Sequence, residues 1–167
     1  LVVAFGGIPL KNTQVSSGGP AQHVAASFLK KAAAAGIEFV NISPIREDVA
    51  APLKAEWLAL RPNTDVALML GLAHTLDSEG LADRAFIASH CVGYERFARY
   101  LHGDDDGQPK DAEWAATICE IDAETIRRLA RRMASRRTLI NTNWSLQRGD
   151  HGEQPFWMTV VLAAMLG

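Results

Sequence analysis

The chain has 167 residues and a formal net charge of -2, with 48% hydrophobic and 22% charged side chains. A chain of this length and composition can bury a core, so it is not a disordered segment. Without an excess of positive charge it is not predicted to bind nucleic acid, and no apolar run reaches the roughly 20 residues of a membrane-spanning helix. Cys91 and Cys119 have neither CxxC nor zinc spacing and are predicted to be reduced thiols.

The first part of the chain has the pattern of a strand, a helix and a second strand. Residues 1–5 and 37–42 are short apolar runs, and residues 21–35 are rich in alanine. Pro20 before the alanine-rich stretch and Gly36 after it are typical of helix ends. A βαβ unit of this kind implies parallel strands and a right-handed crossover.

The rest of the chain is predicted to contain a third strand, five helices, a fourth strand and a last helix. The strands are expected at 56–60 and 138–143. The helices are expected at 65–76, two within 82–102, at 112–118, 123–135 and 153–166. Residues 77–136 are interpreted as a helical insertion between the third and fourth strands. The predicted fold class is α/β, a mostly parallel sheet with flanking helices, with residues 1–167 as a single domain. Because the chain starts inside an apolar run without Met, we expect it to be a piece of a longer protein.

Polar residues follow each predicted strand directly, in the segments 6–14, 41–46, 61–65 and 143–154. Each segment alone is typical of an ordinary strand-to-helix turn. Parallel strands end at one edge of a sheet, where open α/β folds bind ligands, so four such segments indicate a nucleotide-type ligand. Gly6-Gly7 is not GxGxxG, and a conventional nicotinamide site is therefore not predicted.

Two residues of these segments have side chains suited to such a ligand. The Asp65 carboxylate can accept two hydrogen bonds from the adjacent N–H and NH2 groups of guanine, or it can complement the dipole of the helix that it begins. Arg148, near Gln147 and His151, can hold an anionic or oxo-bearing group, or it is a solvated loop arginine. No metal site is predicted, because His151-Gly152-Glu153 lacks the HExxH spacing.

Three stretches occur in the same order as signatures of a known enzyme family. They are Arg61–Leu76, Asp106–Lys110 with Glu113–Ala116, and Trp144–Arg148 with His151–Gln154 and Trp157-Met158. The chain thereby resembles, over nearly its whole length, the dimethyl sulfoxide reductase family of molybdenum enzymes. It is most similar to the branch of biotin sulfoxide, trimethylamine-N-oxide and dimethyl sulfoxide reductases.

The resemblance implies a Rossmann-like domain that holds one of two molybdopterin guanine dinucleotides around a single molybdenum. It implies reduction of S-oxides or N-oxides by oxygen-atom transfer, with the remaining domains of the same polypeptide as partners and the metal ligand outside this fragment. The fragment is not expected to be active alone. A cytoplasmic location is expected from the biotin sulfoxide reductase branch, and a periplasmic one is left open.

The resemblance also implies roles for residues of the carboxyl edge. It assigns the pyrophosphate and pterin to Gly6, Gly7 and Lys11, the guanosine ribose to Asn41, Ser43 and Pro44, and the guanine to Asp65. It places Ser145 and Gln147 at the pterin, and Trp144 and Arg148 at the pterin and the substrate funnel as catalytic residues. The family pattern is not followed at Ile8, at Ser16-Ser17 or at 45–48.

A second hypothesis comes from another functional class. The chain could be a non-catalytic interaction or regulatory module that keeps the fold without the cofactor. Retention of both Asp65 and the pair Gln147-Arg148 favours the enzyme domain, because a module without cofactor has little need of them.

Overall fold

The centre of the protein is a four-stranded parallel sheet in the order β3-β2-β1-β4. The computed structural model describes residues 1–12 and 23–167. The strands are β1 (Val2–Phe5), β2 (Phe39–Ile42), β3 (Glu56–Leu58) and β4 (Leu139–Thr142). Val2 of β1 pairs with Phe39 on one side and with Leu139 on the other. The predicted α/β class with a parallel sheet is confirmed.

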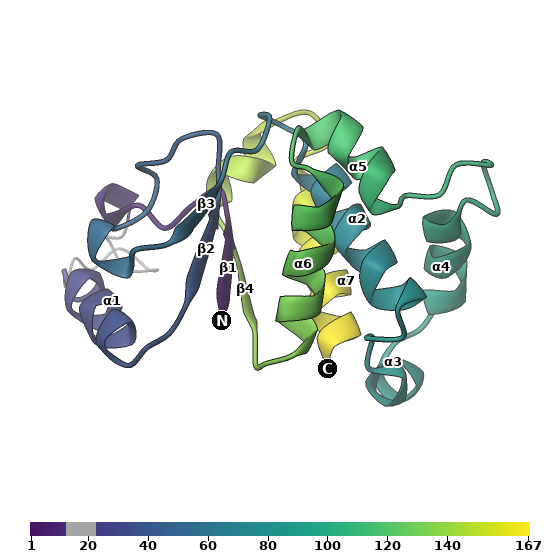
Figure 1. Cartoon of the computed structure of the whole chain (residues 1–167), viewed down its shortest axis with the longest axis horizontal. Helices are drawn as coiled ribbons and strands as arrows, with labels where there is room; N and C mark the ends of the chain where they lie inside the picture. Colours follow the sequence, from purple (N-terminus) through teal and green to yellow (C-terminus); the bar gives the residue numbers. More distant parts are fainter. Residues whose placement is uncertain (13–22) are drawn as a thin grey trace.

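Helices cover both faces of this sheet, as Figure 1 shows. They are α1 (Ala25–Ala34), α2 (Asp65–Ser78), α3 (Arg84–His90), α4 (Tyr94–His102), α5 (Ala112–Cys119), α6 (Ala123–Ala134) and α7 (Glu153–Leu166). Three short 3-10 helices join them: η1 (Leu10–Asn12), η2 (Ala51–Leu53) and η3 (Trp144–Arg148). Helix α1 lies on one face, while α2, α6 and α7 stand beside the other, with α3 and α4 farther out. None of the helices in the described ranges is long and apolar enough to cross a membrane.

The two faces of the sheet carry separate apolar clusters because strand side chains alternate. Val3 and Phe5 of β1 belong to the larger cluster, which includes α2, and both are fully buried. Phe39 of β2 belongs to the smaller cluster under α1 and η2. Most residues of α2 are buried, which fits a helix that is apolar on all sides and lies at the centre of the helical layer.

Aspartates fix the starts of three of the helices beyond the sheet. The side chains of Asp83, Asp111 and Asp122 each accept a hydrogen bond of 2.8 Å from the backbone N–H three residues later. Such caps satisfy donors that the first helical turn leaves unpaired. They explain why α3, α5 and α6 begin where the sequence pattern predicted helices.

Some predicted boundaries were wrong for reasons visible in the backbone. The second strand begins at Phe39 and not at Ile37, because the Ile37 N–H bonds to the Ala32 carbonyl in the turn that ends α1. The third strand ends at Leu58, after which the Arg61 N–H bonds to the carbonyl of Cys119. The predicted loop at 15–19, Pro20, the first residues of the predicted helix and the Ser16-Ser17 departure lie outside the described residues.

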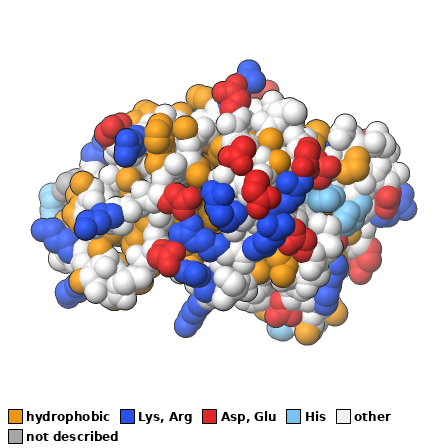
Figure 2. Space-filling view, viewed as in Figure 1, with side chains coloured by type: hydrophobic (Ala, Val, Ile, Leu, Met, Phe, Trp, Pro, Cys, Tyr) orange, Lys and Arg blue, Asp and Glu red, His pale blue; other side chains and the backbone are white. Residues whose placement is uncertain are grey.

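The arginines of α6 and of the turn after it have the sequence pattern of a solvated face, but two of them pair with Glu38 and Glu56 at the amino ends of β2 and β3. Arg132 reaches Glu38 at 2.8 Å and Glu56 at 2.5 Å, and Arg136 reaches Glu38 at 2.6 Å. Hydrogen bonds from Arg136 and Arg132 lower the pKa of Glu38. Figure 2 shows this band of alternating charges across the middle of the molecule, where α6 stands beside the sheet. The band joins the helical layer to the amino ends of β2 and β3.

A second polar cluster holds the outer helices to α2. The Asp77 carboxylate, at the end of α2, is 7% exposed and accepts from Tyr94, from His102 at 2.7 Å and from Arg84 at 2.9 Å. Burial opposes the charged form of Asp77, but the hydrogen bonds from Tyr94 and His102 outweigh it and lower its pKa. The single carboxylate thus links α2 to both α3 and α4.

Candidate functional site

The carboxyl ends of all four strands lie at one edge of the sheet, at the top of Figure 1. The chain runs from β1 outward to β2 and β3 and then returns to the other side of β1 as β4. Loops diverge where the strand order reverses in this way, and open α/β sheets bind ligands at that point. Here the Asn143 side chain donates to the Gly6 carbonyl at 3.1 Å and ties the ends of β1 and β4 together.

Gly6 and Gly7 allow the loop after β1 to pass close to two neighbouring loops. Their φ angles are 76° and 83°, in the region that favours glycine. A Cβ on Gly6 would overlap the side chain of Leu146, and one on Gly7 would overlap the carbonyl of Asp48. Both glycines are therefore needed for packing of the loops, and their predicted contact with a pyrophosphate remains a prediction.

Asp65 lies in a cavity of about 320 Å³ between the start of α2 and the loop before α7. The cavity is lined by Asn63, Asp65, Val66, Leu146, Asp150, His151, Gln154 and Pro155. Asp65 is only 9% exposed, and no side chain of the described ranges forms a hydrogen bond or ion pair with its carboxylate, which accepts a hydrogen bond from its own backbone N–H. Burial raises the pKa of Asp65 to about 6. A buried carboxylate with no side-chain partner disfavours the folded chain, and such a group is a candidate for ligand binding.

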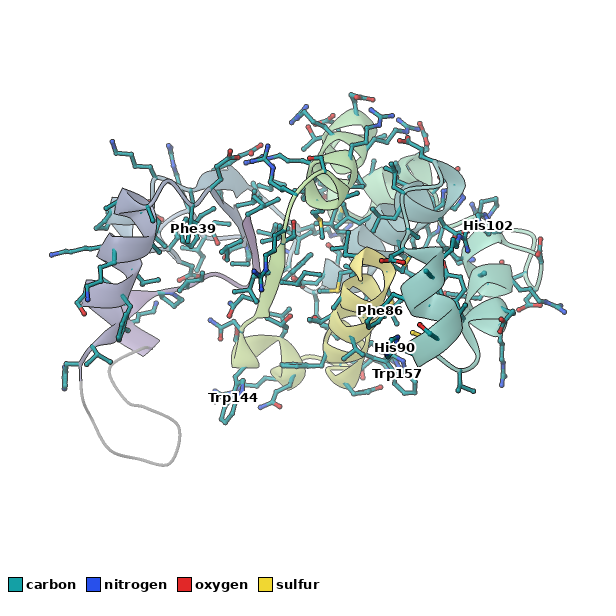
Figure 3. The ribbon with its side chains drawn as sticks, turned by 90° about the horizontal axis from the view of Figure 1, so that it is seen from below. Phe39, Phe86, His90, His102, Trp144 and Trp157 are labelled. Carbon is teal, nitrogen blue, oxygen red and sulfur yellow. The ribbon has the colours of Figure 1, made fainter. Side chains whose placement is uncertain are left out.

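The η3 residues form the rim of the same edge. Trp144 is 74% exposed and projects outward toward the lower margin of Figure 3. Ser145, Gln147 and Arg148 are also exposed, whereas Leu146 turns inward to the cavity. Within the described part of the chain the Arg148 guanidinium has no ion pair, and the neighbouring carboxylates of Asp150 and Glu153 lie closest to His151. This geometry fits both a solvated loop arginine and a group that holds a ligand.

The predicted ribose-binding residues at the end of β2 are buried in a network of their own. Ser43 Oγ donates to the Asp48 carboxylate at 3.2 Å and accepts from the Ile45 N–H at 3.2 Å. The Asn41 amide donates to the Arg46 carbonyl at 3.4 Å, while its own oxygen is buried without a partner in the described residues. These contacts brace the loop at 43–48.

Pro44 and Lys11 flank that network at the surface. Pro44 is exposed on the loop, and the Lys11 ammonium lies 3.6 Å from the Asp48 carboxylate. None of the predicted residues of the β1 and β2 loops lines the Asp65 cavity. The predicted residues of η3, Trp144, Ser145, Gln147 and Arg148, do not line it either, and Leu146 is the η3 residue that does. Of the predicted site residues, Asp65 alone is among those that line the cavity, and the β2 loop lies on the other side of β1.

The other polar residues that line the cavity had been given no binding role from the sequence: Asn63, Asp150, His151 and Gln154. Asn63 adopts a left-handed φ of 67°, which holds its side chain against Gly149. The sequence signal for Asn63 was its position two residues before Asp65, because residues in the same turn can line the same cavity.

Comparison with known proteins places this geometry in a family. Residues 2–167 match the family described as molybdopterin oxidoreductase. The chain is 42% identical over 99% of its length to biotin sulfoxide reductase of Cereibacter sphaeroides, and 49% identical over 99% to trimethylamine-N-oxide reductase 1 of Escherichia coli K12. It is 44% identical over its full length to the dimethyl sulfoxide/trimethylamine N-oxide reductase of Cereibacter sphaeroides. It spans only 22%, 20% and 20% of these three relatives.

A solved structure supports the fold. The acetylene hydratase of Pelobacter acetylenicus matches 99% of the chain and 21% of its own length, with a TM-score of 0.78 and 25% identity. The resemblance drawn from the three sequence signatures is confirmed by these comparisons. The chain belongs to the molybdopterin oxidoreductase family.

Proposed function

We propose that this chain is one domain of a longer polypeptide that reduces S-oxides or N-oxides by oxygen-atom transfer. Its part is to hold the guanosine end of one molybdopterin guanine dinucleotide. Membership of the family implies a molybdenum–pterin cofactor. The relatives named above are reductases of biotin sulfoxide, trimethylamine N-oxide and dimethyl sulfoxide, and the chain spans about a fifth of their length. The single observation that carries the proposal is the buried Asp65 carboxylate in its cavity, which has no side-chain partner in the described residues.

The chemistry of Asp65 fits guanine and not adenine. Guanine presents N1–H and the 2-amino group side by side, and one carboxylate accepts from both. Adenine presents an unprotonated ring nitrogen at the same edge, which would face the carboxylate lone pairs. The cavity of about 320 Å³ lies at the lower end of the range for small-molecule sites, as suits a single base. Val66 and Pro155 supply apolar walls, and Asn63 and Gln154 supply further hydrogen-bonding groups.

The other residues of the edge have positioning roles in this proposal. The glycines at 6 and 7 let the β1 loop lie low, so that a pyrophosphate can cross the sheet edge between β1 and β4. Asn41 and Ser43 are buried, and their hydrogen bonds to Arg46 and Asp48 would hold the loop at 43–48 in shape for the ribose.

When bound, the molybdenum–pterin group supplies the two-electron redox chemistry of oxygen-atom transfer. Ser145 and Gln147, exposed on η3, would hydrogen-bond the pterin. The free guanidinium of Arg148 would donate N–H groups to the oxide oxygen of the substrate or to the pterin, and the exposed ring of Trp144 would exclude water beside it. A second dinucleotide and the metal ligand would come from other domains of the polypeptide. We also propose the cytoplasm as its compartment, which cell fractionation tests.

The test uses the full-length polypeptide and the variant Asp65→Asn. Asparagine has nearly the same size as aspartate, but its oxygen can accept from only one of the two guanine donors. Its NH2 group would face the second guanine donor and could not accept from it. A charged hydrogen bond contributes roughly 1.5–3 kcal/mol, so we expect loss of bound cofactor by about tenfold or more. The assay measures the molybdenum content, the base of the nucleotide released by acid hydrolysis, and turnover of the three oxides.

The matched control is Asp150→Asn, because Asp150 lines the same cavity but is 91% exposed. It should leave cofactor content near wild type. Release of an adenine nucleotide, or full cofactor content in Asp65→Asn, would overturn the assignment of Asp65. A polypeptide with no cofactor and no oxide reduction would support the non-catalytic module instead.

A further inference from the structure

A second hollow lies between α4 and α7, and it shares no lining residue with the Asp65 cavity. It is an open groove of about 540 Å³ with walls that are almost entirely apolar. One wall is formed by Trp157, Val160 and Val161 of α7, and the other by Phe97 and Tyr100 of α4. Trp157 projects from α7 toward the lower margin of Figure 3.

Helix α7 has two apolar faces, and the described chain covers only one of them. Met158, Leu162 and Met165 face the core and are 6%, 0% and 0% exposed. The outer stripe, in contrast, is Trp157, Val160, Val161 and Ala164. Trp157 and Val160 are 69% and 68% exposed, whereas Val161 and Ala164 are half-buried.

The spacing of the outer stripe is that of a helix-packing seam. Its members follow the i, i+3, i+4, i+7 pattern, and α7 has no charged residue after Glu153. A helix that is apolar on all sides is typical of a position buried on all sides. The outer stripe of α7 therefore has the composition of a surface that another element covers.

Helix α4 presents an aromatic stripe to the same groove. Tyr94, Phe97 and Tyr100 are spaced by three residues, and the Tyr94 hydroxyl is fixed by its hydrogen bond to Asp77. Two helices with facing ridges leave a channel into which the side chains of a third helix fit. Arg96 lines the groove, is exposed, and forms no ion pair with any residue in the described ranges.

We propose that this groove receives an apolar helix of the same polypeptide, from outside these 167 residues, with an acidic residue facing Arg96. The inference rests on the proposed function in one respect, the placement of the chain within a longer polypeptide. Relatives that match it are about five times its length, so most of their sequence lies outside the described fold. The apolar walls and the unpaired guanidinium specify an occupant with an apolar face and one carboxylate.

The test measures how strongly the groove is covered in the full-length polypeptide. Val160→Cys places a thiol in the groove, and Phe28→Cys places one on α1 at a side chain of similar exposure, 60% against 68%. Each variant is alkylated in the native state and in urea, and the rate at each cysteine is followed by peptide mass spectrometry. The buried Cys119 reports that the fold is intact.

We expect Val160→Cys to react at least about tenfold more slowly in the native protein than in urea, because labelling then requires local opening. Protection below that level would overturn the proposal. Protection that disappears on dilution of the protein would also overturn it, because it would identify a second copy as the occupant.

The charge of the groove is tested in the Val160→Cys background. Arg96→Glu should speed alkylation several-fold and Arg96→Lys should not, and equal rates would overturn the acidic residue of the occupant. Cofactor content measured on the same samples separates this inference from the proposed function. A loaded enzyme with an unprotected groove refutes only the docked helix, while a protected groove in a polypeptide that binds no cofactor refutes only the proposed function.

Discussion

The Asp65 carboxylate makes a quantitative prediction about the stability of the ligand-free chain. Burial raises its pKa from the ordinary 3.8 to about 6. That difference corresponds to about 3 kcal/mol by which the ionised group disfavours the folded state at neutral pH. Replacement by the neutral isostere in Asp65→Asn should therefore stabilise the ligand-free chain by up to about 3 kcal/mol at pH 7.5.

The sign of the pH dependence follows from the raised pKa. Below pH 4 the Asp65 carboxyl is protonated in both the folded and the unfolded chain, so wild type and Asp65→Asn should be about equally stable. Between pH 4 and 6 the unfolded chain loses the proton while the folded chain keeps it, and the wild type becomes progressively less stable than the variant. Above pH 6 the difference should reach a plateau.

Urea denaturation of the ligand-free chain at a series of pH values measures this difference. Asp150→Asn is the control, because its exposed carboxylate should give a difference near zero at every pH. A variant no more stable than wild type at pH 7.5, or a difference that persists unchanged below pH 4, would refute the reasoning. Guanine nucleotide should stabilise the wild type but not Asp65→Asn.

Three further predictions concern other parts of the chain. Gly7→Ala should destabilise the fold by roughly 3 kcal/mol or more in urea denaturation, because its Cβ would overlap the Asp48 carbonyl. Gly80→Ala is the control: it has open space around it and should cost about 1 kcal/mol for its positive φ alone. Arg148→Ala should leave unfolding free energy and cofactor content unchanged but lower oxide turnover by roughly tenfold, and unchanged kinetics per bound molybdenum would exclude a catalytic role. Asp77→Asn should destabilise by roughly 3 kcal/mol at pH 7, since it removes the shared partner of α3 and α4. The lowered pKa of Asp77 means that this difference should shrink as pH falls below 4, and a constant difference would contradict it.

The sequence was sufficient for the order of the elements and for which loops meet at the carboxyl edge of the sheet. Local sequence preferences agree with the fold at these places. The apolar runs before Gly6 and Asn143 are strands, and an aspartate caps the start of α3, α5 and α6. Asp65 was identifiable because its motif and its place at a helix start both pointed to it. Its assignment to guanine stays a prediction, as do the roles of the η3 residues.

The sequence was not sufficient where the outcome depended on distant partners. The arginines of α6 have the pattern of a solvated face, and only the fold brings Glu38 and Glu56 to Arg132. Lys11 was expected to offer a free cation, but the β2 loop brings Asp48 to within 3.6 Å of it. The outer stripe of α7 was interpreted as part of a buried helix because periodicity cannot tell which faces of an apolar helix have neighbours.

The position of β1 at the centre of the sheet has a consequence for how the chain folds during synthesis. β1 leaves the ribosome before the other three strands of the sheet, yet one of its two neighbours is β4, and the bond from Asn143 to Gly6 joins residues 137 positions apart. Pairings of such long sequence separation form slowly, and an unpaired strand edge invites association with other chains in the meantime. β1 can pair with β2 early, but its other edge has to wait until almost the whole domain has emerged. Until β4 pairs with it, that edge of β1 is open to association with other chains, and a holding chaperone that covers it would protect the growing sheet.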